Sequence, residues 1–255
     1  MESALETHGL RKDFGDVPAV DGIDLLVPRG SFYGFLGPNG AGKSTTIKCL
    51  TGLLRPTAGS FRILGLDPTE DAVALRRHIG VVPEDLGLFD RLTAAETLAF
   101  VGQVHGLARE VLQVRAAELL AFLDLAQVAG ELVADYSHGM RKKLALAAAL
   151  LPAPRLLFLD EPFEGIDAVG SRKIRLVLSE FVAAGGTIFL TSHVLEIVER
   201  LCDHVGVIHR GRLVAQGPLH LLRETAGRSR TLEELFLDLV AAPAGNAAAL
   251  DWLSS

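Results

Sequence analysis

Short apolar segments alternate with helical stretches through most of the chain. Strand-like runs open its first part: ALETHGL (4–10), VDGIDLLV (20–27) and SFYGFLG (31–37). Later runs are rich in β-formers and bounded by turn residues: LLFLD (156–160), TIFLTS (187–192) and HVGVIH (204–209). This alternation predicts a parallel sheet wrapped by helices, in which the later runs are interior or near-interior strands.

The strand signal disappears between about residues 89 and 151, where helical periods take over. Thr93, with Glu96 three residues later, forms a capping box at the start of TAAETLAFVGQVHG. The next segment, REVLQVRAAELLAFLDL, has its leucines at helical spacing. We expect an inserted helical subdomain. The alternative is two ordinary crossover helices, which the length of both helices and the lack of a strand between them disfavour.

The chain becomes helical again after Gly217. TLEELFLDLV carries a second capping box, Thr231 with Glu234, and its apolar side chains share one face: Leu232, Leu235, Phe236 and Leu239. We expect this helix to dock on the rest of the protein. The Ala-rich end of the chain is predicted to be loosely held, with Trp252 making a local contact.

Composition favours a globular protein with a sizeable core, because the 255-residue chain is 49% hydrophobic and 6% aromatic. Its net charge of −6 comes without a basic stripe, so nucleic acid is not expected as a partner. Cys49 and Cys202 lie far apart and belong to no CxxC or Cys/His pattern. Their placement predicts buried thiols rather than a disulfide or a zinc site.

No segment of the sequence is predicted to enter a membrane. The start, MESALETHGLRK, lacks the basic and apolar blocks of a secretory signal, so we expect a cytoplasmic protein. The most apolar run, LALAAALL at 144–151, stops at Pro152 and is far shorter than the ~20 residues that span a bilayer. Any membrane role would therefore need another chain.

GPNGAGKST (37–45) lies between a strand-like run and the helical TTIKCLTGLL, which is the setting that a G-x-x-x-x-G-K-[ST] phosphate loop requires. Backbone N–H groups can face phosphate oxygens where the loop has glycine: Gly37, Gly40 and Gly42. Lys43 would reach the β- and γ-phosphates, and Ser44 would ligate Mg²⁺. The alternative, a glycine-rich turn with a chance lysine, is disfavoured by the order of strand, loop and helix.

LLFLDE (156–161) ends an apolar strand in two carboxylates. Asp160 would hold Mg²⁺ through water, and Glu161 would orient or deprotonate the attacking water. A solvated strand end is the alternative, and the apolar residues before the pair and the phosphate loop disfavour it. No N-K-x-D motif for guanine occurs, so ATP is a better substrate prediction than GTP.

YSHGM (136–140) places a hydroxyl and a glycine at an expected helix start, with a basic turn after it. Backbone N–H groups at a helix start attract anions. From these residues alone, a plain helix cap is the favoured interpretation.

Taken in order, GPNGAGKST, YSHGM, LLFLDEP, GID and TSH resemble the motifs of the ATP-binding subunits of ABC transporters, over about residues 4–217. The resemblance implies an α/β fold: a P-loop NTPase core of the RecA-like, ABC type, with an antiparallel β subdomain and an inserted α-helical subdomain. The implied division is an ATP-binding domain at 1–217 (core about 1–88 and 152–217, helical subdomain about 89–151) and a C-terminal helical extension at 218–255.

In this family, ATP lies between two subunits packed head to tail, which implies a second ATP-binding subunit, most simply another copy of this chain. YSHGM takes the place of the signature motif LSGGQ, so its phosphate would belong to the nucleotide on the partner copy. Ser137 would hydrogen-bond the γ-phosphate, and the amides of Gly139 and Met140 would add positive potential. The form YSxGM is common among export-type members.

Other site residues carry over individually from the resemblance. The phosphate loop contributes Gly37, Pro38, Asn39, Gly40, Ala41, Gly42, Lys43, Ser44 and Thr45. Phe14 takes the place of an aromatic residue that stacks on adenine, with Val20 against the sugar or base. Asp167 matches a loop residue that crosses the dimer interface. His193 matches a histidine that contacts the γ-phosphate and aligns Glu161 with water.

Glu84 is the largest departure from the family pattern, which commonly has Gln at this position. The resemblance implies that Glu84 contacts Mg²⁺ together with Ser44 and Asp160, and that it links the core to the helical insert. A carboxylate adds negative charge near the γ-phosphate. Glu also occurs here among export-type members.

The resemblance implies an energy-coupling ATPase that uses ATP and Mg²⁺, lies on the inner face of the cell membrane and drives a separate transmembrane permease. The permease would dock between Glu84 and the helical insert, where LGLFDRLT presents apolar residues. Export is favoured because VPE, YSHGM and TLEELFLDL resemble exporter subunits.

One alternative is a soluble ABC ATPase acting on DNA or the ribosome, although the sequence has neither a long coiled coil nor a second nucleotide site. Another is a non-hydrolysing subunit, although four key residues are intact: Lys43, Asp160, Glu161 and His193.

Overall fold

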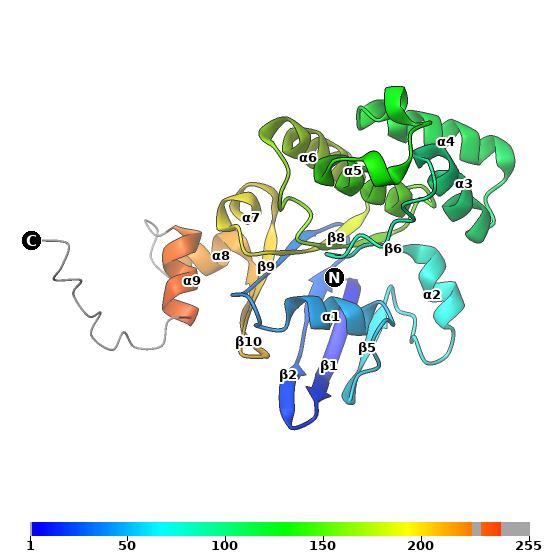
Figure 1. Ribbon diagram of the computed structural model, residues 1–255. Coiled ribbons are helices and arrows are strands. Elements are labelled where there is room, and N and C mark those ends of the chain that lie inside the picture. Colours follow the sequence, from blue (N-terminus) through cyan, green and yellow to red (C-terminus); the bar gives the residue numbers. More distant parts are fainter. Residues whose placement is uncertain (1, 226–230, 241–255) are drawn as a thin grey trace, which may run out of the picture.

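Two β-sheets face each other across helix α1 (Lys43–Leu50), and further helices cover the outer face of the larger sheet (Figure 1). The computed structural model describes residues 2–225 and 231–240. The Ala-rich end of the chain with Trp252 lies outside these residues, so the contact expected there stays a prediction.

Within the described residues, the larger sheet has six strands in the order β10-β9-β4-β8-β7-β6. Their bounds are β4 (Phe32–Leu36), β6 (Ile79–Val82), β7 (Leu156–Asp160), β8 (Thr187–Ser192), β9 (His204–His209) and β10 (Arg212–Pro218). Neighbouring strands are parallel except β10, which pairs antiparallel with β9. The three later apolar runs form β7, β8 and β9, and all three are interior strands, as predicted.

The smaller sheet is antiparallel and contains β1 (Ser3–Phe14), β2 (Val17–Ile23), β3 (Leu26–Pro28) and β5 (Ala58–Ile63). The run at 20–27 is divided between β2 and β3, and SFYGFLG contributes β4 of the larger sheet. Apolar side chains from both sheets and from α1 form one buried cluster, in which Tyr33 stacks on Phe189 with 5.6 Å between ring centroids. The cluster fixes α1, and with it the loop that precedes the helix, against the ends of the parallel strands.

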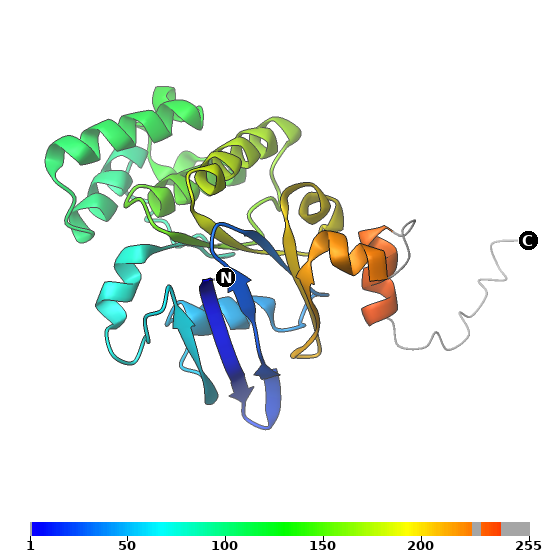
Figure 2. The same cartoon turned by 180° about the vertical axis from the view of Figure 1, so that it is seen from behind.

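Helices α5 (His138–Leu150), α6 (Ala168–Ala183) and α7 (Leu195–Leu201) pack on the other face of the larger sheet (Figure 2). After β10 come α8 (Leu219–Thr225) and α9 (Leu232–Val240), and α9 contacts α7 and β9. The predicted docking of the C-terminal helix is therefore confirmed. Its capping box is also present, because the Glu234 amide donates to Thr231 Oγ1 at 3.2 Å and the Thr231 amide donates to Glu234 Oε2 at 2.9 Å.

The segment between β6 and β7 projects from the sheet as a group of helices (Figure 1). After α2 (Ala72–His78) and β6 come α3 (Ala94–Val104), α4 (Arg109–Phe122), two short 3-10 helices (Ala126–Val128 and Val133–Asp135) and α5. These helices share a hydrophobic cluster of their own, and the predicted capping box of Thr93 and Glu96 begins α3. A separate cluster supports an inserted subdomain over two simple crossover helices.

Candidate active site

The loop that joins β4 to α1 wraps closely because two of its glycines leave no room for a side chain. A Cβ at Gly37 would lie 2.4 Å from the carbonyl oxygen of Ile208, and one at Gly42 would lie 2.3 Å from the carbonyl oxygen of Ala19. Gly42 also has a φ of 109°, a left-handed conformation that favours glycine. In the described structure no side chain caps α1, so the N–H groups of its first turn are available to an anion.

Lys43 begins α1, and its buried side chain folds back over this loop. The ammonium nitrogen donates to the carbonyl oxygen of Gly37 at 2.8 Å and lies 3.7 Å from Oε1 of Glu161. The positive charge therefore stands between the phosphate loop and the end of β7.

Ser44 connects the phosphate loop to the first carboxylate of the DE pair. Its hydroxyl donates to Oδ1 of Asp160 at 3.2 Å, and Thr191 of β8 donates to the same oxygen at 2.5 Å. Asp160 is only 2% exposed. Glu84 is exposed and more distant, with its Oε2 3.5 Å from the Ser44 hydroxyl.

Glu161 is held through one of its two carboxylate oxygens. Oε2 lies 3.0 Å from Nδ1 of His193 and accepts from the His193 amide at 3.3 Å. Oε1 is buried and has no hydrogen-bond partner in the described part of the chain. A buried acceptor without a partner is unfavourable unless a ligand or water completes it, so this oxygen marks a point of reaction or binding.

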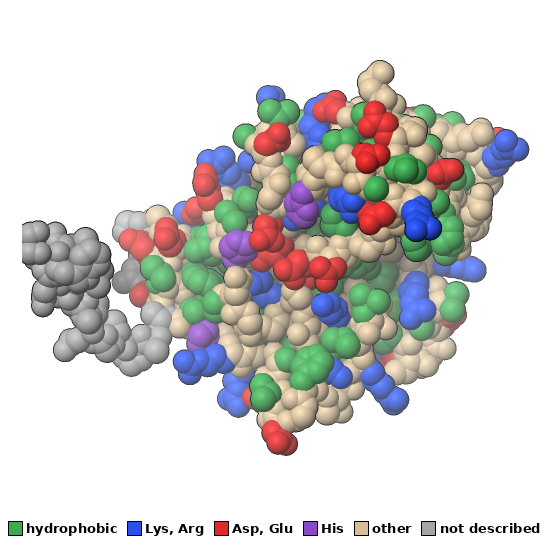
Figure 3. Space-filling view, viewed as in Figure 1, with side chains coloured by type: hydrophobic (Ala, Val, Ile, Leu, Met, Phe, Trp, Pro, Cys, Tyr) green, Lys and Arg blue, Asp and Glu red, His purple; other side chains and the backbone are tan. Residues whose placement is uncertain are grey.

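One cavity of about 430 Å³, which has the size of a ligand site, is lined by most of these side chains, whereas the buried Asp160 and Thr191 do not line it. Acidic side chains and histidines gather on the face that contains it, between α1 below and α5 and α6 above (Figure 3). The lining residues are Ala19, Asn39, Gly40, Gly42, Lys43, Ser44, Thr45, Glu84, Glu161, Glu164 and His193.

The two residues expected at the adenine differ in their placement. Phe14, at the end of β1, is 52% exposed, and the Lys12 ammonium lies 5.3 Å from its ring centroid. Val20 is fully buried in the core, and its neighbour Ala19 lines the cavity instead.

The signature-like segment and Asp167 lie outside this cavity. Ser137 is exposed at the start of α5, where its hydroxyl accepts from the Met140 amide at 3.2 Å. Tyr136 is buried, and its hydroxyl donates to the Val128 carbonyl at 2.7 Å, which anchors the segment to the helical insert. Asp167 is an exposed N-cap of α6 and accepts from the Gly170 amide at 2.6 Å.

Sequence reasoning gave no role to four residues that touch the site. Ala19, Thr191 and Glu164 are described above, and Lys142 of α5 donates to the backbone carbonyl of Glu161 at 2.7 Å. Glu164 could have been suspected from its place three residues after the DE pair. Thr191 belongs to the TSH motif, of which only His193 was given a role. Lys142 carried no such signal, since it reaches the site from α5.

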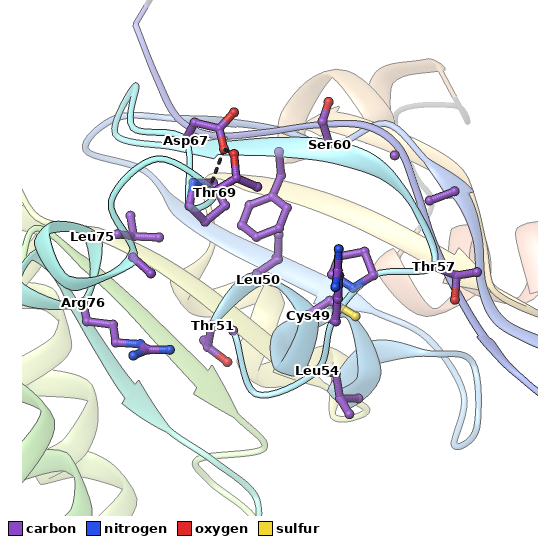
Figure 4. A pocket seen from close by; sticks show the side chains of 18 residues that line it. Cys49, Leu50, Thr51, Leu54, Thr57, Ser60, Asp67, Thr69, Leu75 and Arg76 are labelled. Carbon is purple, nitrogen blue, oxygen red and sulfur yellow. Dashed lines mark hydrogen bonds between the residues drawn. The ribbon is translucent and has the colours of Figure 1, made fainter.

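A different cavity, of about 620 Å³, lies between the end of α1, β5 and α2. Cys49, Leu50, Leu75 and Arg76 line it, and a hydrogen bond joins Asp67 and Thr69 at one side (Figure 4). None of the site residues predicted from the sequence lines this cavity. Cys49 and Cys202 are both free and buried, as expected.

Known proteins of similar sequence and structure are ATP-binding subunits. The ABC transporter family model matches residues 20–164. A daunorubicin/doxorubicin resistance ATP-binding protein of Streptomyces peucetius is 41% identical over 224 residues, which cover 88% of this chain and 68% of that protein. A bacitracin transport ATP-binding protein of Bacillus licheniformis is 37% identical over 225 residues, covering 88% and 72%.

Solved structures give the same result. An ATP-binding subunit of an ABC transporter superposes with a TM-score of 0.88 at 32% identity, over 93% of this chain and 99% of that one. A dimeric cassette in a post-hydrolysis state with ADP and phosphate shares the fold, with a TM-score of 0.78 at 24% identity over 84% and 98%. The family match and the chemistry of the cavity lead to one conclusion: the chain belongs to the ABC transporter family, as an ATP-binding subunit that hydrolyses ATP.

Proposed function

We propose that the 430 Å³ cavity holds the triphosphate of ATP, with Lys43 against the β- and γ-phosphates and Phe14 stacked on the adenine. The observation that carries this proposal is the convergence of Lys43, Asp160 and Glu161 where α1 begins and β7 ends. An ammonium group and an uncapped helix start both attract anionic phosphate. The exposure of Phe14 leaves its ring accessible to a base.

The oxygen atoms around Ser44 fit a magnesium ion. Ser44 and Asp160 present a hydroxyl and a carboxylate 3.2 Å apart, and Mg²⁺ prefers such hard donors. In the described residues no cluster of three or more His, Cys, Asp and Glu side chains forms a metal cage. Mg²⁺ in nucleotide sites keeps waters and phosphate oxygens as ligands, so few protein ligands suffice. When bound, the ion would neutralise charge on the transferred phosphoryl group.

Glu161 is the general base in this proposal. Its Oε1 has no hydrogen-bond partner among the described residues and can accept a proton from water, while His193 fixes Oε2. The water oxygen attacks the γ-phosphorus as its proton passes to Glu161, and the bond from phosphorus to the ADP oxygen breaks. The proton then passes to phosphate, and ADP and inorganic phosphate leave.

The chain would act as a head-to-tail pair, with two composite nucleotide sites. Ser137 and Asp167 are exposed and point to no nucleotide pocket of their own chain, which supports a role against a second copy. The Ser137 hydroxyl accepts one helix N–H and keeps its own proton to donate to a phosphate oxygen.

A transmembrane permease is the proposed partner, and export is the proposed direction. None of the helices in the described part of the chain has the length and hydropathy needed to cross a bilayer. A groove of about 500 Å³ runs between the 79–89 segment, α3 and α5, and it presents the exposed rings of Phe89 and Phe100. The similar proteins are named for drug resistance and for bacitracin transport, which supports export from the inner face of the cell membrane. They do not favour action on DNA or the ribosome.

Glu161→Gln is the direct test of the base. We expect ATP hydrolysis to fall by about a hundredfold or more, since general base catalysis contributes about that much. ATP binding should remain, because the substitution does not alter the phosphate loop or Lys43. Phosphate release and equilibrium ATP binding should be measured on the same preparation, and an unchanged rate of hydrolysis would contradict the assignment.

A further inference from the structure

Lys142 lies five residues beyond Ser137 on α5, and its side chain enters the protein instead of solvent. The residue is 4% exposed, and its ammonium donates to the backbone carbonyl of Glu161 at 2.7 Å. A buried charge is unfavourable without partners, so this contact fixes where the ammonium stands.

The backbone of Glu161 needs to be held. Its φ is 48°, in the left-handed region that a non-glycine residue rarely adopts and keeps only where neighbours hold it. Thr191 secures one side, because its hydroxyl and its carbonyl accept from the Glu161 amide at 3.1 and 3.3 Å. Lys142 secures the other side at the carbonyl.

The direction of the Glu161 carboxylate depends on this backbone conformation. With the left-handed turn, the side chain leaves β7 toward His193 and Lys43. A shift of about 1 Å in a catalytic group can lower a rate about a hundredfold. A side chain that holds the peptide can therefore control hydrolysis without touching ATP.

The charges around Lys142 are those of the active site itself. Burial lowers the pKa of Lys142, and four carboxylates act against that effect: Glu164, Glu161, Glu84 and Asp160. The ammonium thus stands within electrostatic reach of every acid near the proposed metal position.

We propose that Lys142 is a positioning residue for Glu161, holding its peptide in the left-handed conformation from the helix that begins at YSHGM. The inference rests on the proposed role of Glu161 as base. In the proposed dimer, the start of α5 faces the nucleotide on the partner copy. Lys142 then connects that nucleotide to the base that serves the chain's own nucleotide.

The test compares Lys142→Met with Lys143→Met in the full 255-residue chain, using Mg·ATP. Methionine keeps the length of the side chain and removes the donor. We expect Lys142→Met to lower kcat about tenfold to a hundredfold while KM for ATP stays within about threefold. Lys143 is the matched control, one position along α5 and without a contact to Glu161 among the described interactions, and Lys143→Met should keep kcat within about twofold.

Lys142→Arg is the conservative variant, since it retains a cationic donor, and it should recover most of the activity. An equal loss of kcat in Lys142→Met and Lys142→Arg would overturn the proposal, as would an unchanged kcat in Lys142→Met. A merely structural role would instead raise KM and lower the melting temperature together with kcat, and that outcome also overturns it. If Lys142→Met does not fold, Lys142→Arg decides: low kcat in a folded chain contradicts the proposal.

Glu161→Gln, measured alongside, separates this inference from the proposed function. If Glu161→Gln hydrolyses ATP normally, the base assignment fails and the inference fails with it. If Glu161→Gln is inactive while Lys142→Met is fully active, the base assignment stands and only the role of Lys142 is wrong.

Discussion

Ser44 stands between two acids that are held very differently. Asp160 is buried and accepts hydrogen bonds from both Ser44 and Thr191. Glu84 is exposed, and its 3.5 Å separation from the Ser44 hydroxyl is at the limit of a hydrogen bond. The two carboxylates should therefore contribute unequally, even though both were assigned to magnesium.

We predict that Glu84→Gln keeps ATPase activity within about threefold of the unaltered chain, because an exposed amide replaces a weakly held carboxylate. Asp160→Asn should lower kcat by about a hundredfold or more, since a buried charge at the proposed metal position is lost. Steady-state hydrolysis over a range of Mg²⁺ concentrations measures both. Near-complete loss in Glu84→Gln would show that its charge is required after all.

For single residues, the sequence predicts site residues that are adjacent along the chain and misses those that folding brings together. The phosphate loop and the DE pair are motifs because each function needs adjacent residues. Thr191 and Lys142 meet that pair from positions 31 and 19 residues away, and no local spacing records either contact. The placement of Val20 differs for a related reason, because strand β2 turns Val20 into the core and Ala19 toward the cavity.

Among the elements, α3 and the 86–89 segment build the groove proposed for the permease. The Phe89 and Phe100 rings meet edge to face, with centroids 5.6 Å apart, and are 56% and 46% exposed. Aromatic side chains that remain exposed beside a groove are typical of a protein interface.

We predict that the double variant Phe89→Ser, Phe100→Ser no longer co-purifies with the proposed membrane partner. Basal ATPase activity should stay within about twofold, because neither ring lines the cavity proposed for ATP. Phe122→Ser is the matched control, an aromatic ring of similar exposure on α4 that does not line the groove. Loss of the partner in the control, or its retention in the double variant, would contradict the docking site.

Elements with strong local signals are predictable, and short or divided ones are not. Both capping boxes occur where Thr93 and Thr231 predict them. The run at 20–27 divides because Leu25 donates its amide to the Thr7 hydroxyl between β2 and β3, a contact 18 residues distant. The start of α6 is also predictable, because Asp is a favoured N-cap residue and the Asp167 side chain accepts a hydrogen bond from the Gly170 amide.

For the whole molecule, four buried thiol and phenol groups link stability to alkaline pH. Burial raises the pKa of Cys49, Tyr33, Tyr136 and Cys202, the last well above its ordinary value of 9.0. Each group stays protonated in the folded chain and ionises in the unfolded chain. The stabilisation is therefore complete below the pKa of the unfolded group and is lost as the pH rises.

We predict that the free energy of unfolding falls above about pH 9, by up to about 1.4 kcal/mol per pH unit for each thiol. Cys202→Ala should flatten this decline relative to the unaltered chain. Lys142 contributes to the free energy of unfolding in the opposite direction, because its lowered pKa favours folding as the pH rises. This contribution is the same in Cys202→Ala and in the unaltered chain, so it cancels when the two are compared. Urea unfolding between about pH 8 and 10.5 measures the slopes, and parallel curves for the two proteins would disprove the role of Cys202.

The fold as a whole separates the two halves of the proposed composite site. One chain carries Lys43 and Glu161 in its cavity, while Ser137 is exposed outside that cavity. In the proposed dimer, ATP is hydrolysed only where these halves come from different copies.

Co-expression of two inactive variants tests that claim directly. Chains with Lys43→Ala and chains with Ser137→Arg, carrying different affinity tags, should each be inactive alone. The purified mixed dimer has one intact site, made of Lys43 from one copy and Ser137 from the other, and we predict that it regains roughly a tenth to a half of the normal ATPase rate. A mixed dimer as inactive as its parents, or full activity of Ser137→Arg by itself, would contradict the composite site.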